Sequence, residues 1–194
     1  AEVMQLVAQL NPQYPPVCQI EEALNKLYEE HKAAYRREVE AQGLSWEKEQ
    51  RNDPWKGLYP YCHAEYRDVK GRLVPEAEAQ AKGARIWIWR EGDISMPATK
   101  QSPTTRDPQH KNYRFYRPIH PLTGKPCPHP KRGWNLPYDD DSPGARSFRA
   151  LEQDGRIVWG TDETKVPQLK RFLHEVETNV GKSVIVDYSD GEKQ

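Results

Sequence analysis

The sequence predicts an α+β fold: a small mixed sheet flanked by helices, with a long proline-rich basic loop and an N-terminal helical segment. Three observations predict it. Residues 20–42 carry apolar side chains at helical spacing, residues 85–90 read as a buried strand, and nine of the 17 prolines lie between Pro97 and Pro137. The chain of 194 residues suits one domain with an appendage. We divide it into a helical segment, residues 1–56, and a domain, residues 57–194.

The N-terminal segment is dominated by a predicted amphipathic helix from Ile20 to Gln42, with Gly43 placed to end it. Its opposite face is almost entirely charged, so the apolar face needs a surface, either the rest of this chain or a partner. The chain opens on Ala1 inside a helical-looking stretch, and we expect it to be a piece of a longer protein. The apolar face of the helix is formed by Ile20, Leu24, Leu27, Tyr28, His31, Tyr35 and Val39.

Short elements are predicted on both sides of the loop. A hairpin is expected over 65–74 around Lys70-Gly71, and Arg85 to Arg90 is expected to be a central strand because both of its faces are apolar. The C-terminal third is predicted to hold a helix over 145–154, a strand over 156–159, a helix over 166–180 and a strand over 183–188.

The composition excludes several classes of protein. The mean hydropathy is −1.00, yet 6 Trp, 10 Tyr and 3 Phe argue against a disordered chain. No apolar run approaches the roughly 20 residues that cross a bilayer. The three cysteines are odd in number and far apart, and no signal segment opens the chain, which favours a cytoplasmic protein without a disulfide framework.

Positive charge is concentrated in one part of a chain whose net charge is zero. Residues 1–60 carry a balance of −3, residues 61–138 one of +7, and residues 139–194 one of −4. Between Lys100 and Leu136 eight Lys or Arg residues accompany only Asp107. Such clustering indicates a directed contact with an anionic partner.

No catalytic or metal-binding residue is predicted. Cys127 with His129, and Cys62 with His63, lack the paired spacing of a structural zinc site, and ordinary packing is the preferred interpretation. The aspartates at 139–141 suit a solvated turn better than a cation site. Nucleophile-elbow, Walker and HExxH motifs are absent. A small metal-dependent nuclease built on His120 and His129 is a remote alternative, since neither has an evident carboxylate partner.

The basic loop carries the stronger functional signal, because its cations alternate with Tyr113, Phe115, Tyr116 and Trp134. Lys and Arg contact phosphates, Arg also reads guanine edges, and aromatic rings stack on bases. The alternative is that the rings form a core and the cations merely surround it. We assign Trp134 to packing and expect Thr123-Gly124 to make the turn that presents Lys125.

The stretch from Tyr116 to Trp134, which contains Thr-Gly-Lys and Gly-Trp, resembles a segment of amino-group DNA methyltransferases, especially the modification subunits of type III restriction systems. The resemblance continues in the family's order, and the helix at 20–42 is its least diagnostic part. The further matching segments are Asp53-Pro-Trp-Lys56, the hairpin near Gly71, Leu151 to Gly160, Lys165 to Leu173 and Asp187 to Lys193.

The resemblance implies that residues 57–194 are a target-recognition domain, which binds double-stranded DNA for a bacterial adenine-N6 methyltransferase. Leu136-Pro137-Tyr138 is only superficially like the catalytic DPPY motif, and no FxGxG motif occurs, so S-adenosylmethionine and methyl transfer are expected in the rest of the parent chain. Implied partners are that chain, a second copy and a restriction subunit. The residues expected to contact DNA are Arg106, Lys111, Arg114, Arg117, Lys125, Lys131, Arg132, Lys170 and Arg171.

A protein interaction or dimerisation module, docking through the helix at 20–42, is the alternative to DNA recognition. The two interpretations are compatible if different parts of the chain serve them. The recognised DNA sequence does not follow from side-chain identity alone, because docking geometry decides which base edge an arginine meets.

Overall fold

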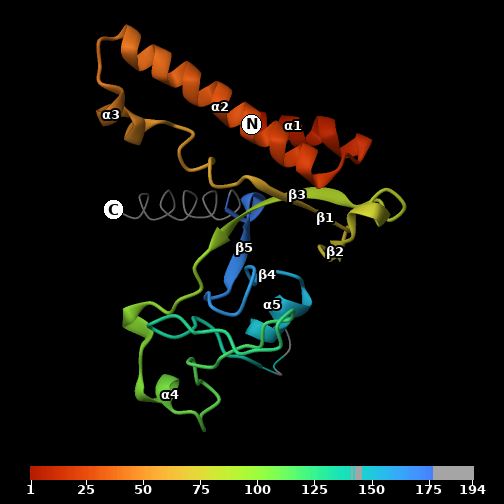
Figure 1. Ribbon diagram of the computed structural model, residues 1–194, viewed down its shortest axis with the longest axis vertical. Helices are drawn as coiled ribbons and strands as arrows, with labels where there is room; N and C mark the ends of the chain where they lie inside the picture. The colour runs from red at the N-terminus through yellow and green to blue at the C-terminus, as the bar shows by residue number, and fades with distance from the viewer. Residues whose placement is uncertain (141, 143–145, 177–194) are drawn as a thin grey trace, which may run out of the picture. The chain divides into compact units, whose positions relative to one another are not determined.

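A computed structural model of the chain describes residues 1–140, 142 and 146–176. It confirms the α+β class (Figure 1). The helices are α1 (Glu2–Leu10), α2 (Val17–Ala41), α3 (Trp46–Glu49), α4 (Pro103–Arg106) and α5 (Phe148–Gln153), joined by short 3-10 turns. The strands are β1 (His63–Arg67), β2 (Leu73–Val74), β3 (Arg85–Gly92), β4 (Ile157–Val158) and β5 (Gln168–Phe172).

The strands form one sheet in the order β2-β1-β3-β5-β4. β1 pairs antiparallel with β2 and with β3, and β4 pairs antiparallel with β5. β3 occupies the centre, as its two apolar faces predict. The predicted hairpin at 65–74 is confirmed, with Tyr66 opposite Val74.

Backbone contacts divide the chain into two compact units. Unit 1 is Ala1–Arg90 with Phe172–Gln194, and unit 2 is Glu91–Arg171. The division that we drew at residue 56 follows sequence character rather than contacts, and it stays a prediction. Each unit has a hydrophobic cluster of its own.

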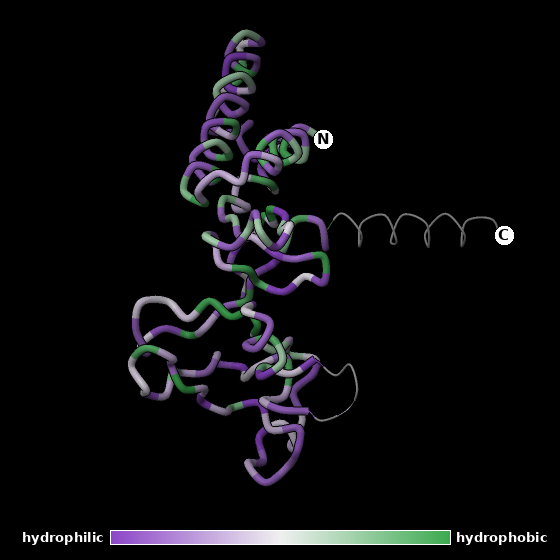
Figure 2. The backbone as a smooth tube through the Cα atoms, turned by 90° about the vertical axis from the view of Figure 1, so that its right-hand side faces the viewer, coloured by the Kyte–Doolittle hydropathy of each residue, from purple (hydrophilic) through white to green (hydrophobic). Residues whose placement is uncertain are grey.

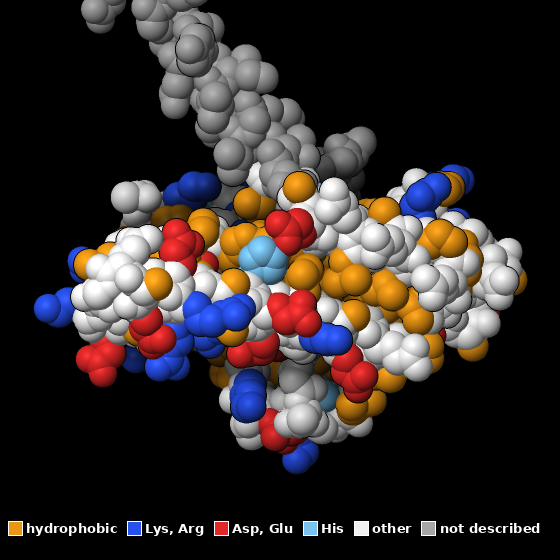
Figure 3. All heavy atoms as spheres, turned by 90° about the horizontal axis from the view of Figure 1, so that it is seen from above, with side chains coloured by type: hydrophobic (Ala, Val, Ile, Leu, Met, Phe, Trp, Pro, Cys, Tyr) orange, Lys and Arg blue, Asp and Glu red, His pale blue; other side chains and the backbone are white. Residues whose placement is uncertain are grey.

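In unit 1 the apolar face of α2 is buried against the sheet. Ile20 and Leu24 have no exposed surface, and they share a cluster with Tyr66 and Ile86 of the sheet. Hydrophobic and hydrophilic residues are interspersed along the turns of α2 (Figure 2). Charged side chains of both signs are interspersed on the surface in Figure 3. The predicted helix is thus confirmed, and its own chain covers the apolar face.

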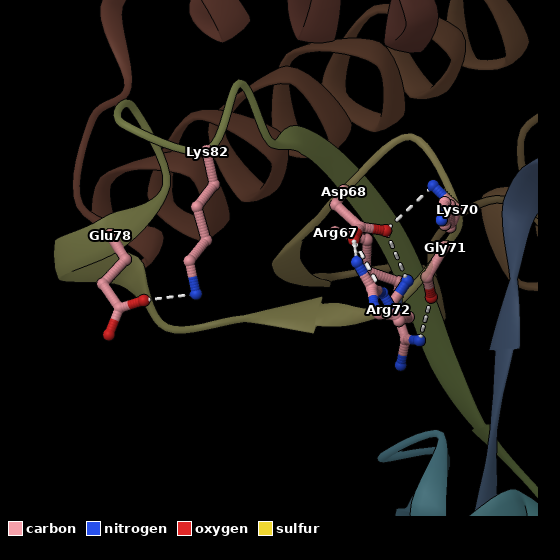
Figure 4. Close-up of polar contacts among 7 residues, drawn as sticks. All are labelled: Arg67, Asp68, Lys70, Gly71, Arg72, Glu78 and Lys82. Atoms are coloured by element: carbon pink, nitrogen blue, oxygen red, sulfur yellow. Dashed lines mark hydrogen bonds and ion pairs between the residues drawn. The ribbon is translucent and has the colours of Figure 1, made fainter.

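The β1–β2 turn is held by one carboxylate (Figure 4). Asp68 Oδ1 accepts hydrogen bonds from the backbone N–H of Lys70 (2.9 Å) and of Arg72 (3.0 Å), and Oδ2 accepts from Arg72 Nε (2.8 Å). Gly71 has φ +78°, and a Cβ there would lie 3.0 Å from Trp87, so this position requires glycine. The hydrogen bonds from Arg72 and Lys70 hold the pKa of Asp68 below its ordinary value of 3.8.

We expect Asp68→Asn to destabilise the chain in a pH-dependent way. A carboxylate whose pKa is lowered by folding contributes stability above its unfolded pKa and loses that contribution as the pH falls through the folded value. The difference in free energy of unfolding between the native chain and the variant should therefore be largest near neutral pH and shrink below pH 3.8. Urea unfolding across a pH series measures it, and a difference that stayed constant into strong acid would contradict the assignment.

The structure near the C-terminus differs from the prediction in one element. The helix predicted over 166–180 is wrong in its first part, because Gln168–Phe172 is strand β5, with Leu169 opposite Ile157 of β4. The apolar spacing of Leu169, Phe172 and Leu173 suits a helix, but strand pairing decided the outcome. Helical backbone begins at Leu173 and is described to residue 176. The strand predicted over 183–188 lies outside the described residues.

The helix predicted over 145–154 is confirmed for Phe148–Gln153, and the strand over 156–159 for Ile157–Val158. Ser147 caps α5 by accepting a hydrogen bond from Ala150 N at 3.2 Å. Within residues 1–140, 142 and 146–176, no helix combines the length and the apolar character that crossing a membrane requires.

Candidate nucleic-acid interface

The basic loop, residues 97–137, packs around an aromatic centre in unit 2 that consists of Trp134, Tyr116 and Phe148. Trp134 has no exposed surface, stacks on Tyr116 with ring centroids 5.4 Å apart, and donates from Nε1 to Tyr116 O at 2.8 Å. Phe148 of α5 meets both rings edge-on. Burial raises the pKa of the Tyr116 hydroxyl above its ordinary value. The assignment of Trp134 to packing is confirmed, and the centre fixes the segments that carry the cations.

Lys131 and Arg132 project from a tight turn beside this centre. Gly133 N donates to Pro130 O at 2.8 Å, and Gly133 O accepts from Met96 N at 2.8 Å. Gly133 has φ +78°, and a Cβ there would lie 2.8 Å from Arg114 O, so no larger residue fits. Both cations are exposed. The Gly-Trp motif therefore has a structural reason: glycine makes the turn and tryptophan anchors it.

A groove of about 330 Å³ lies next to this turn. Arg171 contacts one residue of its lining, because Arg171 Nη2 donates to Asp93 O at 2.9 Å. The Asp93 carboxylate is engaged by Ser95, through Ser95 N at 2.8 Å and through the Ser95 hydroxyl. The groove is lined by Asp93, Ser95, Pro130, Lys131, Arg132, Val166, Pro167 and Gln168.

Sequence reasoning missed three polar residues of this groove, Asp93, Ser95 and Gln168. They come from the two ends of unit 2: Asp93 and Gln168 are 75 positions apart in the sequence. Only the tertiary fold brings them to the Lys131-Arg132 turn. The sequence offered no local signal for them, since Gln168 falls in a segment predicted to be helical.

A second group of predicted cations is Arg106, Lys111 and Arg114, in the segment that leads to Phe115. The guanidinium of Arg106 lies 5.5 Å from the Phe115 ring, and Arg106 Nη2 donates to Gln101 Oε1 at 2.8 Å. Arg114 is half-buried, and desolvation lowers its pKa. Its Nη1 is buried without a hydrogen-bond partner in the described part of the chain. Lys111 is exposed. Arg106 and Lys111 are thus the accessible members of this group.

A third group is Arg117, which directly precedes the loop from Pro118 to Cys127, and Lys125, which lies on that loop. Arg117 Nε donates to Cys127 O at 3.2 Å and Arg117 Nη2 to Pro126 O at 3.3 Å, so the loop positions this cation. Lys125 Nζ lies 3.1 Å from Glu163 Oε1. The pKa of Glu163 is lowered by its own backbone N–H, then by Lys125 and Thr123. The predicted Thr123-Gly124 turn is present, with Gly124 N donating to His120 O at 2.9 Å.

Lys170 and Arg171 were predicted on the exposed face of a helix, and this placement is wrong. Both lie in strand β5. The Arg171 side chain crosses Gly92, where a Cβ would lie 2.2 Å from Arg171 Nε. Lys170 N donates to Arg156 O at 2.9 Å. Arg171 is exposed and Lys170 half-buried, so their contact with DNA stays a prediction.

The histidines and cysteines do not converge. Among the described residues, no three His, Cys, Asp or Glu side chains lie together in a way that could hold a metal ion. His129 Nδ1 lies 2.9 Å from Pro130 O, while His120 is buried beneath its own loop. Burial raises the pKa of the Cys127 thiol. Asp139 forms an ion pair of 2.5 Å with Arg149.

Comparison with known proteins connects the chain to restriction-modification enzymes. Over 86 residues it is 29% identical to the type III restriction-modification enzyme EcoP15I Mod subunit of Escherichia coli. The match covers 44% of this chain and 12% of that relative. It supports a relation to a region of such a modification subunit. No family model matches the chain, and no solved structure matches it.

Proposed function

We propose that this chain is part of the DNA target-recognition region of a type III modification subunit, which methylates adenine N6 with S-adenosylmethionine. Two observations support the proposal: the similarity to the EcoP15I Mod subunit, and the Lys131-Arg132 turn beside a groove in unit 2. The second carries the assignment to DNA. Two exposed cations on a tight turn suit phosphate contacts, and the polar side chains Ser95 and Gln168 in the lining of the neighbouring groove suit contact with base edges.

Within the groove, Gln168 and Arg132 are our candidates for base reading. A glutamine amide pairs with the N6 and N7 edge of adenine, and an arginine pairs with the O6 and N7 edge of guanine. Lys131 is assigned to phosphate, because an ammonium group contacts charge with little directional preference. Arg171, Arg106, Lys111, Arg117 and Lys125 would extend the phosphate contacts along the duplex.

The remaining properties of the longer protein are part of this proposal. The chain has no DPPY and no FxGxG motif, so we assign methyl transfer and S-adenosylmethionine binding to other parts of the enzyme, and no step of that chemistry to these residues. A second copy and a restriction subunit are its proposed protein partners. A base must leave the duplex to be methylated, so the recognition region has to hold DNA during that change.

The alternative, an interaction module that docks through α2, has less support. Ile20, Leu24 and Tyr28 are buried in the core of unit 1, and Val39 near the end of the helix is also buried. A helix whose apolar face already packs on its own chain leaves a charged surface for a partner. We therefore place DNA recognition first.

Charge reversal tests the proposal. Lys131→Glu with Arg132→Glu should weaken binding of a mixed-sequence duplex at low salt by at least about tenfold, because phosphate contacts supply most non-specific affinity. The slope of log K against log salt should fall by about two, since each lost contact removes about one. Fluorescence anisotropy over a salt series measures both quantities.

A matched control separates a local contact from net charge. Lys48→Glu with Arg51→Glu changes the total charge equally, at two exposed positions of unit 1. The control should bind close to the native chain, with an unchanged circular dichroism spectrum for both double variants. Equal weakening by the two pairs would remove the Lys131-Arg132 turn from the proposed interface, and no duplex binding by the native chain at low salt would refute DNA recognition.

A further inference from the structure

The loop from Pro118 to Cys127 ends in an apolar side chain that the protein leaves uncovered. Leu122 is 82% exposed, and Ile119 on the same loop is 53% exposed. Apart from Val69 in unit 1, no large hydrophobic residue among those described is more exposed than Leu122. Arg117 directly precedes the loop and Lys125 lies on it, paired with Glu163, and residues 117–127 themselves include neither Asp nor Glu.

The base of this loop is firmly fixed. Cys127 N donates to Pro118 O at 2.8 Å, and His120 N donates to Lys125 O at 2.8 Å. Ile119 and Pro126 form an antiparallel bridge. Pro118, His120 and Cys127 are all buried. The loop is thus a small anchored hairpin whose sides are tied together below its tip.

A buried histidine holds the tip itself. His120 has no exposed surface, and its Nδ1 accepts hydrogen bonds from the backbone N–H of Leu122 and of Thr123, each at 3.3 Å. Accepting at Nδ1 places the proton of a neutral imidazole on Nε2. Glu163 holds the other side of the tip through Lys125 and Thr123. Leu122 is therefore presented by a backbone that is already ordered.

We propose that Leu122 is a wedge that enters duplex DNA at a base step, and this inference rests on the proposed function. Leucine is among the side chains that proteins insert between bases to unstack and kink a duplex. A preordered loop loses little conformational freedom on insertion. Lys125 lies next to the tip, and Arg117 is held at the base of the loop through Pro126 O and Cys127 O, where cations would meet the flanking phosphates. An enzyme that acts on an extruded base benefits from a side chain that occupies the disturbed stack.

The charge of the loop favours DNA over a protein as the occupant. A protein contact normally requires an apolar patch of a few hundred Å². Here the large apolar side chains exposed on the loop are Ile119 and Leu122, flanked by the exposed Pro121 and Pro126, and they lie within the most basic stretch of the chain. A single leucine matches the size of one base step better than it matches a protein interface.

The test compares two short duplexes of the same sequence, one fully paired and one with a single abasic site. Insertion of a wedge contributes most binding free energy where the base stack is already broken, because unstacking intact DNA costs a few kcal/mol. The full native chain should prefer the abasic duplex by about tenfold. Leu122→Ala should reduce that preference to within about twofold, whereas Leu122→Met should retain it.

Val69→Ala is the matched control, since Val69 is 86% exposed on the β1–β2 turn of unit 1 and should leave the preference unchanged. Equal affinity of the native chain for the two duplexes would overturn the wedge and leave DNA recognition standing. No binding to either duplex would overturn both. A preference unaltered by Leu122→Ala, with loss of concentration-dependent self-association in sedimentation, would instead identify Leu122 as a protein contact.

Discussion

Replacing Trp134 by alanine is expected to lower the free energy of unfolding of unit 2 by about 3–5 kcal/mol, the range for large aromatic residues truncated in a core. Trp134 has no exposed surface and contacts Tyr116 and Phe148. Alanine would leave a cavity between these rings and remove the hydrogen bond to Tyr116 O. Urea unfolding followed by near-ultraviolet circular dichroism measures the loss.

This variant should also lose duplex binding, although Trp134 does not reach the surface. Gly133 and Trp134 follow the Lys131-Arg132 turn directly, and Trp134 N donates to Arg114 O at 2.7 Å. Loss of the ring would release the backbone that positions both cations. Trp134→Phe is the control: it keeps an aromatic ring, leaves Tyr116 O without this donor, and should cost about 1–3 kcal/mol with binding largely retained. Equal stability of native chain and Trp134→Ala would contradict the packing role.

Elements with a strong local pattern could be predicted from the sequence. The sequence of α2 has apolar residues at helical spacing, because one face of the helix is buried. The sequence of β3 has apolar residues on both faces, because the strand lies in the centre of the sheet. Strand β5 could not be predicted in the same way. Its apolar residues fit helical spacing, and its pairing with β4, through Leu169 and Ile157, is a tertiary contact that no local pattern contains.

The cations of the candidate interface could be predicted from the sequence, but the groove beside them could not. The clustering of cations between residues 100 and 136 is a property of the linear chain, and so is the alternation with aromatic residues. The groove was not predictable, because Asp93 and Gln168 meet only in the folded unit. The accessibility of each cation was also hidden: Arg114 is half-buried, whereas Lys131 and Arg132 are exposed.

No local sequence pattern marks Arg67, yet its replacement should destabilise the chain as much as the replacement of Trp134. Arg67 is 1% exposed, its Nε lies 2.6 Å from Glu65 Oε1, and its Nη1 donates to Gly71 O at 2.6 Å. The guanidinium also lies 4.8 Å from the Phe172 ring and 5.4 Å from the Trp87 ring. One side chain thus joins β1, its turn, β3 and the end of β5.

We expect Arg67→Ala to lower the free energy of unfolding of unit 1 by about 3–5 kcal/mol, the usual cost of removing one partner of a buried ion pair. Most of the loss arises because the buried carboxylate of Glu65 loses the guanidinium beside it. Replacing both residues, with Glu65→Leu and Arg67→Met, removes that carboxylate as well. The double variant should therefore be about as stable as the native chain, and more stable than Arg67→Ala by about 3–5 kcal/mol.

Arg72→Ala supplies the comparison with an exposed pair. Arg72 is 71% exposed and pairs with Asp68 at 2.7 Å, so its loss should cost about 0–1 kcal/mol. Urea unfolding of the four chains at neutral pH gives all the differences. If Arg67→Ala costs no more than Arg72→Ala, the guanidinium does not stabilise unit 1. If the double variant is no more stable than Arg67→Ala, the loss in Arg67→Ala does not come from the Glu65 carboxylate.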